Sequence, residues 1–106
     1  LAQVLASLPK VSVVHQRVRT PFEQKGSVMR GVLERARGDE VVLIDGVKTI
    51  DATGWTLVVP DPEEAVTHVY AESEDIGGSF ERARRGANEI LLILDEARAA
   101  NSVEAR

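Results

Sequence analysis

Apolar residues recur with helical spacing in three segments of the chain. The first, residues 1–9 (LAQVLASLP), carries them at Leu1, Val4, Leu5 and Leu8 and ends at a proline, which cannot continue a helix. A helix this short is marginal on its own. We therefore interpret residues 1–9 as the tail of a preceding helix whose start lies upstream.

The second helical segment follows Thr20. We expect Thr20 to be its N-cap, Pro21 to occupy the first helical position and Glu23 to complete a capping box. Gly31 weakens the helix by about 1 kcal/mol relative to alanine, and Gly38 is a natural stop. The apolar positions on one face are Val28, Met29, Val32, Leu33 and Ala36.

The third helical segment is the longest. Ser73 is its predicted N-cap, although Gly77–Gly78 interrupts the first turn and leaves Ser79 as an alternative start. We expect residues 101–106 to fray. Three arginines, Arg82, Arg84 and Arg85, are predicted to project outward as a solvated face. The apolar face comprises Ile76, Phe80, Ala83, Ala87, Ile90, Leu91, Leu94 and Ala97.

Between these segments, β-branched residues and alternating polarity predict strands. They are Val11–Arg19, Glu40–Asp51 with a turn or bulge at Asp45-Gly46, Trp55–Val59 and Val66–Glu72. In the last strand, Val66, His68 and Tyr70 should share one face, opposite Thr67, Val69 and Ala71.

This order of elements predicts an α+β domain. Strands joined by short turns run antiparallel, so we expect a four-stranded, mainly antiparallel sheet with two helices on one face, preceded by the short helix end. The domain itself should span residues 10–100.

Composition and charge narrow the classes of function. The chain has 106 residues and a net charge of −4, which argues against partners that are nucleic acids or anionic membranes. It has no cysteine, so a reducing, cytoplasmic location is the default expectation. No apolar run approaches the ~20 residues that span a bilayer. Because the sequence opens with Leu1, we interpret it as a piece of a longer protein.

Candidate chemistry is sparse. His15 and His68 lie in separate predicted strands without a third metal ligand at a suitable spacing, so we interpret them as ordinary strand histidines and expect no metal site. Nucleophile-elbow, P-loop and dinucleotide motifs are absent. Trp55 is expected to anchor the core. On these grounds alone the domain is non-catalytic and carries no cofactor.

Two stretches resemble a known family. Residues 44–59 read IDGVKTIDATGWTLVV and residues 59–72 read VPDPEEAVTHVYAE. They resemble the C-terminal domain of the phosphomannomutase/phosphoglucomutase (α-D-phosphohexomutase) family over residues 10–95. The segment PFEQKGSVMR at Pro21–Arg30 is similar to a variant that is fused to a sugar nucleotidyltransferase of the mannose-1-phosphate guanylyltransferase type.

The resemblance implies a fold related to half of the TATA-binding protein, in agreement with the element order above. It also implies a mobile lid whose RPSGTEP loop grips the substrate phosphate. The phosphoserine and the Mg²⁺ site of the mutases lie in preceding domains, so we expect magnesium there and none here. Catalytic residues are accordingly expected to be absent from this domain.

The phosphate loop departs from the family pattern. Val59 stands in place of arginine, Asp61 of serine, Pro62 of glycine and Glu63 of threonine, while Pro60 and Glu64 match. The guanidinium, both hydroxyls and one N–H group are thereby lost. Each carboxylate ~4 Å from a phosphate oxygen would cost about 1 kcal/mol in water and more at lower dielectric. We interpret the loop as a degraded site.

Three hypotheses follow. The first is a structural or regulatory lid-like domain, packed against the preceding domains of a nucleotidyltransferase/mutase fusion in GDP-mannose-type synthesis. The second is the phosphate-binding domain of an active mutase, with a sugar phosphate held by loop N–H groups or by His68, Lys48 or Arg30. The third is a stand-alone self-association module that uses the sheet face or the arginine-bearing helix.

Overall fold

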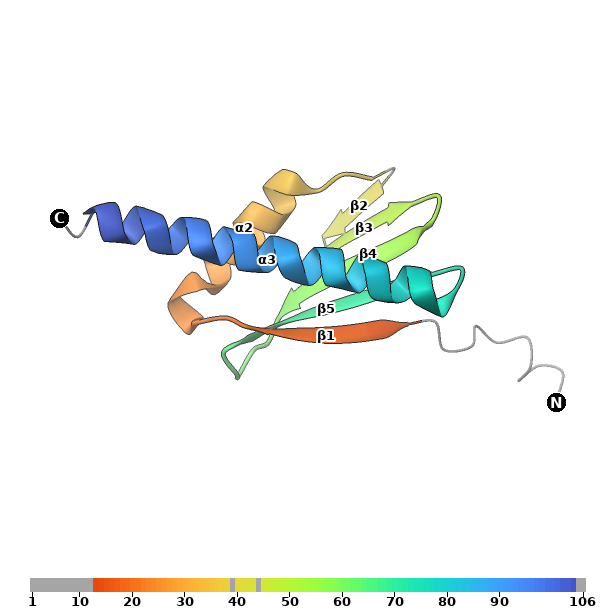
Figure 1. The fold of residues 1–106 in the computed structure, drawn as a ribbon, viewed down its shortest axis with the longest axis horizontal. Helices are drawn as coiled ribbons and strands as arrows, with labels where there is room; N and C mark the ends of the chain where they lie inside the picture. The colour runs from red at the N-terminus through yellow and green to blue at the C-terminus, as the bar shows by residue number, and fades with distance from the viewer. Residues whose placement is uncertain (1–12, 39, 44, 105–106) are drawn as a thin grey trace, which may run out of the picture.

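Five strands and two α-helices make up the part of the chain that the computed structural model describes, residues 13–38, 40–43 and 45–104 (Figure 1). The helix end expected over residues 1–9 lies outside this part. In chain order the elements are β1 (Val14–Arg19), the 3-10 turn η1 (Phe22–Gln24), α2 (Lys25–Arg35), β2 (Glu40–Leu43), β3 (Val47–Asp51), β4 (Gly54–Pro60), β5 (Val66–Ser73) and α3 (Ile76–Glu104).

The strands form one antiparallel sheet in the order β1-β5-β4-β3-β2. The α+β class is confirmed, but the predicted count of four strands is wrong, because the segment Glu40–Asp51 forms two strands instead of one. Asp45 adopts a left-handed φ of 60°, which aspartate tolerates better than most residues, and the chain reverses there. The Asp45-Gly46 signal therefore marks a hairpin turn rather than a bulge within one strand.

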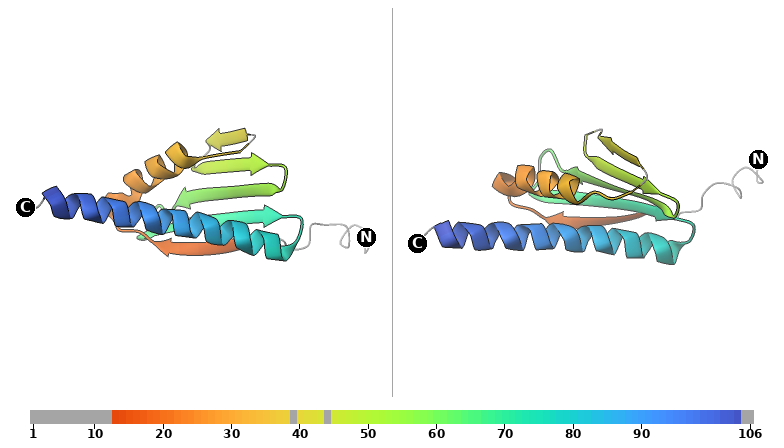
Figure 2. Two further views of the ribbon diagram at one scale, coloured as in Figure 1. Left: turned by 45° about the horizontal axis from the view of Figure 1, so that its top comes forward. Right: turned by 90° about the horizontal axis from the view of Figure 1, so that it is seen from above.

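Both helices cover the same face of the sheet (Figures 1 and 2). Alternation along β5 places Thr67, Val69 and Ala71 under them, each fully buried, as the polarity pattern predicts. The buried apolar cluster joins both helices to β1, β3, β4 and β5 and comprises Val14, Val18, Val28, Val32, Val47, Val58, Val69, Ala71, Ala83, Ala87, Ile90 and Ile93.

The contact between α2 and α3 explains a glycine that is unfavourable by helix propensity. A Cβ atom on Gly31 would lie 2.9 Å from Cδ1 of Ile93, closer than side chains pack. Gly31 thus allows the two helices to approach each other. The propensity cost of this glycine is offset by the packing that it permits.

The start of α2 differs from the prediction. Thr20 does not cap the helix, because its hydroxyl is fully buried in bonds to the carbonyl oxygen of Val18 (3.0 Å) and the hydroxyl of Thr67 (2.7 Å). Pro21 precedes the turn η1 without a side-chain cap. The helix ends at Arg35, and Ala36 turns the chain out with an extended ψ of 131°, before Gly38.

The helix α3 begins at Ile76, ahead of the two glycines, and continues to Glu104, beyond the predicted onset of fraying. Asp75, not Ser73, receives the N–H of Gly78 (2.7 Å). The N–H of Ser73 instead donates to the hydroxyl of Ser79 (2.9 Å). Asp75 therefore performs the capping role that the sequence analysis gave to Ser73.

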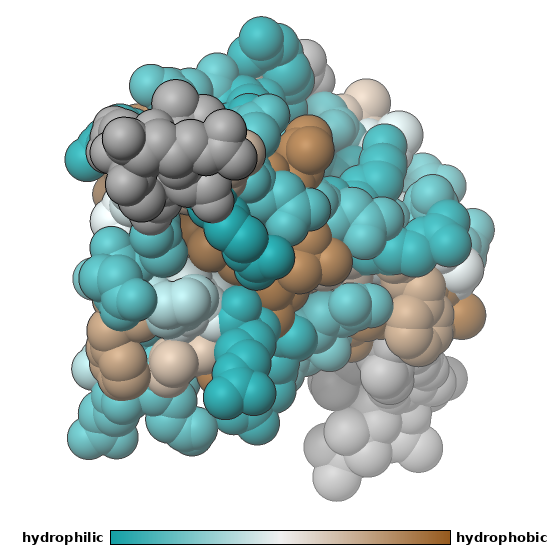
Figure 3. Space-filling view, turned by 60° about the vertical axis from the view of Figure 1, so that its left-hand side comes forward, coloured by the Kyte–Doolittle hydropathy of each residue, from teal (hydrophilic) through white to brown (hydrophobic). Residues whose placement is uncertain are grey.

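The buried face of α3 is only partly the predicted one. Ile76, Phe80 and Leu91 are about half exposed, at 48%, 54% and 50%, whereas Ser79 and Arg82 are buried. Polar residues thus occupy part of the side of α3 that faces the sheet. The buried face of the helix therefore differs from the face that the apolar spacing predicts. Viewed with the left-hand side of Figure 1 forward, apolar residues lie exposed among polar ones (Figure 3).

Candidate functional site

The loop over residues 61–65 joins β4 to β5 beside the start of α2. The ammonium group of Lys25 donates to the carbonyl oxygens of Asp61 and Glu64 and lies 4.1 Å from the ring centroid of Phe22. The N–H of Thr20 donates to the carbonyl oxygen of Ala65 (2.8 Å). The loop is therefore held to the β1–α2 connection on two sides.

The carboxylate of Asp61 lies inside this loop. Its Oδ1 accepts the backbone N–H groups of Glu63 (2.8 Å) and Glu64 (2.7 Å). The N–H of Asp61 donates to the carbonyl oxygen of Val66 (2.9 Å), and Pro60 and Pro62 have no N–H to offer. Every backbone donor between residues 60 and 64 thus already has an acceptor within the loop or at its end.

A line of aromatic side chains leads from Asp61 across the uncovered face of the sheet. Oδ2 of Asp61 lies 2.8 Å from Nε2 of His68, and Nδ1 of His68 lies 2.8 Å from Nε2 of His15. The His15 ring stacks on Tyr70 with centroids 4.4 Å apart. Because an ionised carboxylate only accepts, Nε2 of a neutral His68 donates to Asp61, and its Nδ1 accepts from His15.

The electrostatics of this line favour an ionised Asp61. The hydrogen bond from His68, followed by those from the N–H groups of Glu64 and Glu63, holds the pKa of Asp61 well below its usual range. Burial lowers the pKa of His15, and His68 and Arg17 lower it further through charge repulsion. The loop therefore carries a fixed negative charge at its centre.

The other predicted site residues are only partly brought together. Val59 pairs with His68 in the β4–β5 ladder, and Glu63 and Glu64 are exposed. Arg17 approaches Glu64 at 3.4 Å, a weak surface pair.

Of the three auxiliary candidates, His68 contacts the loop and Arg30 shares a mostly apolar groove with Pro60. Lys48 lies instead over the ring of Trp55, 4.8 Å from its centroid. The groove has a volume of about 400 Å³, and its remaining lining residues are Met29, Leu33, Asp45, Gly46 and Val47.

Two residues of the loop's surroundings escaped the sequence analysis. Lys25 and His15 reach the site from α2 and from β1, which pairs with the non-consecutive strand β5. His15 and His68, which are predicted to be ordinary strand histidines, bond to each other across the sheet. Only the β1–β5 register could have revealed this, and no local pattern encodes it.

Trp55 does not anchor the core. It lies partly buried on the face that the helices leave uncovered, where its Nε1–H donates to Oε1 of Glu72 (2.8 Å) and Lys48 lies over its ring. Trp55 directly follows Gly54, and its position along β4 places its side chain on the face of the sheet that points away from the helices. A strand tryptophan can thus be half covered by its neighbours in the sheet.

Within residues 13–38, 40–43 and 45–104, no group of three or more histidine or carboxylate side chains is arranged to hold a metal ion. In the same part of the chain, no helix combines the length and the apolar character needed to cross a membrane.

No family model matches the chain. A curated protein of Methanopyrus kandleri, "Probable phosphoglucosamine mutase", is 36% identical to it over 96 residues, which is 89% of this chain and 20% of that protein. This match supports a phosphohexomutase-family domain. The chain spans about a fifth of the length of this relative. The resemblance read from the two framework segments is thus supported at the level of the family, while the fusion to a nucleotidyltransferase stays a prediction.

Proposed function

We propose that this chain is the C-terminal, lid-like domain of a phosphohexomutase-family protein and that its own role is structural or regulatory. The match to a phosphoglucosamine mutase supports the family, and the IDGVK…GW…VYAE framework supports the position within it. The relative's name makes a hexosamine phosphate the first substrate to test for the parent protein. The domain would close over, or pack against, the preceding domains without gripping a phosphate itself.

The observation that carries this proposal is the internal bonding of Asp61. A phosphate in the loop would have to replace the Asp61 carboxylate at the N–H groups of Glu63 and Glu64. It would also meet two exposed glutamates, with no arginine at position 59 to offset their charge. The loop is thus occupied by an anion that belongs to the chain.

Further features of the parent protein are part of the same proposal. The segment Pro21–Arg30 supports a fusion with a mannose-1-phosphate guanylyltransferase-type domain in GDP-mannose-type synthesis. Magnesium would be bound in the preceding domains, and the protein would be cytoplasmic. Lys25, which donates to two loop carbonyl oxygens, belongs to this segment, so the variant sequence and the altered loop are in direct contact.

Titration of the ¹⁵N-labelled chain with glucosamine 6-phosphate, mannose 6-phosphate and glucose 1-phosphate tests the proposal. We expect no shifts of the amides of residues 61–65. A triple variant that restores the family residues (Val59→Arg, Asp61→Ser, Glu63→Thr) should bind. The single variant Asp61→Ser is the matched control that frees the N–H groups without supplying a guanidinium. Saturable shifts of the loop amides in the natural chain would overturn the loss of the site.

The alternative of an active, phosphate-binding domain has one observation in its favour. Arg30 and Pro60 line the same groove, so a guanidinium lies near the start of the loop. Mutase turnover by the full-length protein, abolished by deletion of residues 59–65 and reduced by Arg30→Gln, would support it. Turnover that survives the deletion would favour the structural role.

A further inference from the structure

A second polar region lies on the other side of the sheet. The helices α2 and α3 leave a cavity of about 270 Å³ between them, above strands β3 and β4. Its base includes the apolar residues Val32, Val47 and Val58. The small residue Gly86 also lines it and lets α3 pack closely on β5, since a Cβ atom there would be 2.9 Å from Cγ1 of Val69.

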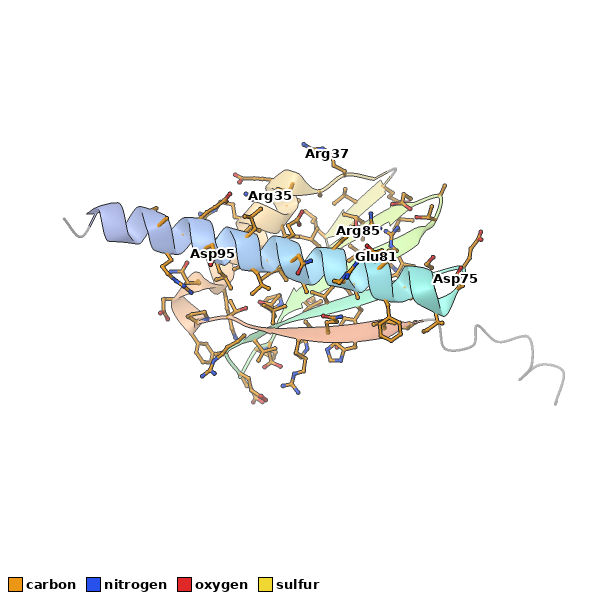
Figure 4. The ribbon with its side chains drawn as sticks, in the orientation of Figure 1. Arg35, Arg37, Asp75, Glu81, Arg85 and Asp95 are labelled. Atoms are coloured by element: carbon orange, nitrogen blue, oxygen red, sulfur yellow. The ribbon has the colours of Figure 1, made fainter. Side chains whose placement is uncertain are left out.

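The charges around this cavity differ from those of the chain as a whole. Four arginines line it, Arg35, Arg37, Arg82 and Arg85, against two carboxylates, Asp51 and Glu89. The lining thus carries an excess of two positive charges in a chain whose net charge is −4. Figure 4 shows Arg35, Arg37 and Arg85 on the same side of α3, toward α2, β2 and β3.

One of these arginines is bound by the protein through its Nε and Nη1 atoms. Arg82 is buried, and its Nε lies 3.3 Å from the carbonyl oxygen of Trp55. Its Nη1 donates to both carboxylate oxygens of Asp51 (3.1 and 3.2 Å) and to the hydroxyl of Thr53 (2.7 Å). Arg82 and Asp51 therefore neutralise each other and form a wall of the cavity, not a ligand contact. This also corrects the prediction that Arg82 projects outward.

The remaining arginines keep capacity to donate. Arg35 pairs with Glu96 at 2.7 Å. The carboxylate of Glu96 is more than half exposed to solvent and does not line the cavity. Arg37 donates to the carbonyl oxygen of Ala36, and neither Arg37 nor Arg85 pairs with a carboxylate within the described part of the chain. A guanidinium carries five N–H donors, so most of those on Arg37 and Arg85 are open to a ligand.

We propose that this cavity binds the phosphate group of a small anion, through Arg37 and Arg85 with support from Arg35. Arg37 and Arg85, which pair with no carboxylate in the described part of the chain, supply two positive charges for a phosphate dianion, and guanidinium groups suit its geometry. The volume exceeds that of a phosphate, so a small phosphomonoester fits as well as the free ion. The proposal does not depend on the loop at residues 61–65 or on the role of the parent protein.

Titration of the whole chain with inorganic phosphate and with glycerol 3-phosphate, at low ionic strength, tests the site. We expect saturable NMR shifts of the Arg85 and Gly86 amides and of arginine Nε–H groups, with residues 61–65 unmoved. The double variant Arg37→Gln/Arg85→Gln should weaken binding at least about tenfold. Glu89→Gln, which removes a carboxylate from the lining, should tighten it. Tighter binding of glycerol 3-phosphate than of phosphate would identify a phosphomonoester as the ligand class, and equal binding the free ion.

The matched control is Arg84→Gln. Arg84 lies on the same helix but is exposed and pairs with Glu81 at 2.8 Å, so its loss should leave binding unchanged. Arg37 and Arg85 are exposed, so the double variant should fold, which circular dichroism checks. Absence of shifts up to tens of millimolar ligand would overturn the proposal. So would an equal loss of binding in Arg84→Gln, because it would indicate general charge attraction.

Discussion

The loop at residues 61–65 and the cavity between α2 and α3 are both rich in charged groups, but those groups are used differently. In the loop, each backbone donor from residue 60 to 64 has a partner, and the Asp61 carboxylate fills the centre. In the cavity, Arg37 and Arg85 retain donors beyond those the described protein engages. The capacity of a polar region to bind a ligand therefore depends on its unused donors, not on its place in a familiar fold.

Loss of the Arg82 guanidinium should lower the stability of the fold more than any other change considered. It tests whether Arg82 has a structural role in the wall of the cavity. Arg82→Leu removes a buried guanidinium that donates to Asp51 and to the carbonyl oxygen of Trp55, and it should cost about 3 kcal/mol in the free energy of unfolding, although Asp51 keeps its bonds from Thr53. Urea denaturation measures it. Arg84→Leu, on the exposed side of α3, should change this energy by less than about 0.5 kcal/mol. Equal effects of the two substitutions would show that the Arg82 contacts contribute no stability.

Lys25 tests whether the loop is held from α2. Lys25→Met removes the donor to the carbonyl oxygens of Asp61 and Glu64, and it should cost about 1 kcal/mol in the free energy of unfolding. Arg30→Met, an exposed change on the same helix, is the control and should be close to neutral. A neutral Lys25→Met would mean that the loop keeps its shape without the ammonium group.

Removal of the Asp61 carboxylate should give the loop free N–H donors and so make it similar to the cavity in this respect. In Asp61→Ala, the N–H groups of Glu63 and Glu64 lose their acceptor and should exchange with solvent faster. Asp61→Asn keeps an acceptor at Oδ1 and should preserve much of the protection. Hydrogen exchange followed by NMR distinguishes the two variants. Equal protection in Asp61→Ala and the natural chain would contradict an anchoring role for the carboxylate.

Acid should first act through His15, on the face of the sheet that the helices leave uncovered. The pKa of His15 is lower in the folded than in the unfolded chain, so the unfolded state takes up its proton first as the pH falls below about 6.5. Stability should therefore decline between pH 7 and pH 5. It should decline further below pH 4, where the unfolded chain protonates Asp61 and Asp51 while the folded chain, in which the pKa of both carboxyls is lowered, keeps them ionised. His15→Gln should flatten the upper part of this decline in thermal unfolding curves. An unchanged slope would contradict it.

Local sequence patterns predict the helices, three of the five strands and the buried face of β5, but they predict neither the β2–β3 hairpin nor the polar contacts. Alternation from Val66 to Glu72 fixed the buried side, because a strand has only two faces. The sequence predicts that Arg82 points outward, because charged side chains are usually solvated, yet Asp51 and Thr53 bind it from the sheet. The sequence also predicts that the Thr20 hydroxyl caps a helix, because its actual partner, Thr67, is distant along the chain.

Some features of the candidate site can likewise be predicted from local sequence, whereas others depend on contacts between distant segments. That the phosphate loop has changed could be predicted from the residues at positions 59, 61, 62 and 63, because the loss of donors is visible in the sequence. That Asp61 fills the loop, and that His68 and His15 extend its bonding, depends on the β1–β5 pairing. The cavity arginines come from the end of α2, the segment just after it and α3, and four strands separate the two helices along the chain, so no spacing rule joins them.

The helix α3 is much longer than the strands that it covers. Its 29 residues extend about 44 Å, whereas the eight residues of β5, the longest strand, extend about 27 Å. Ile93 of α3 packs against Gly31 of α2, and the turns of α3 beyond this contact form a projecting arm. Glu96 on this arm pairs with Arg35, which lines the cavity. The Arg35–Glu96 pair is thus the point at which the projecting turns of α3 connect to the lining of the cavity.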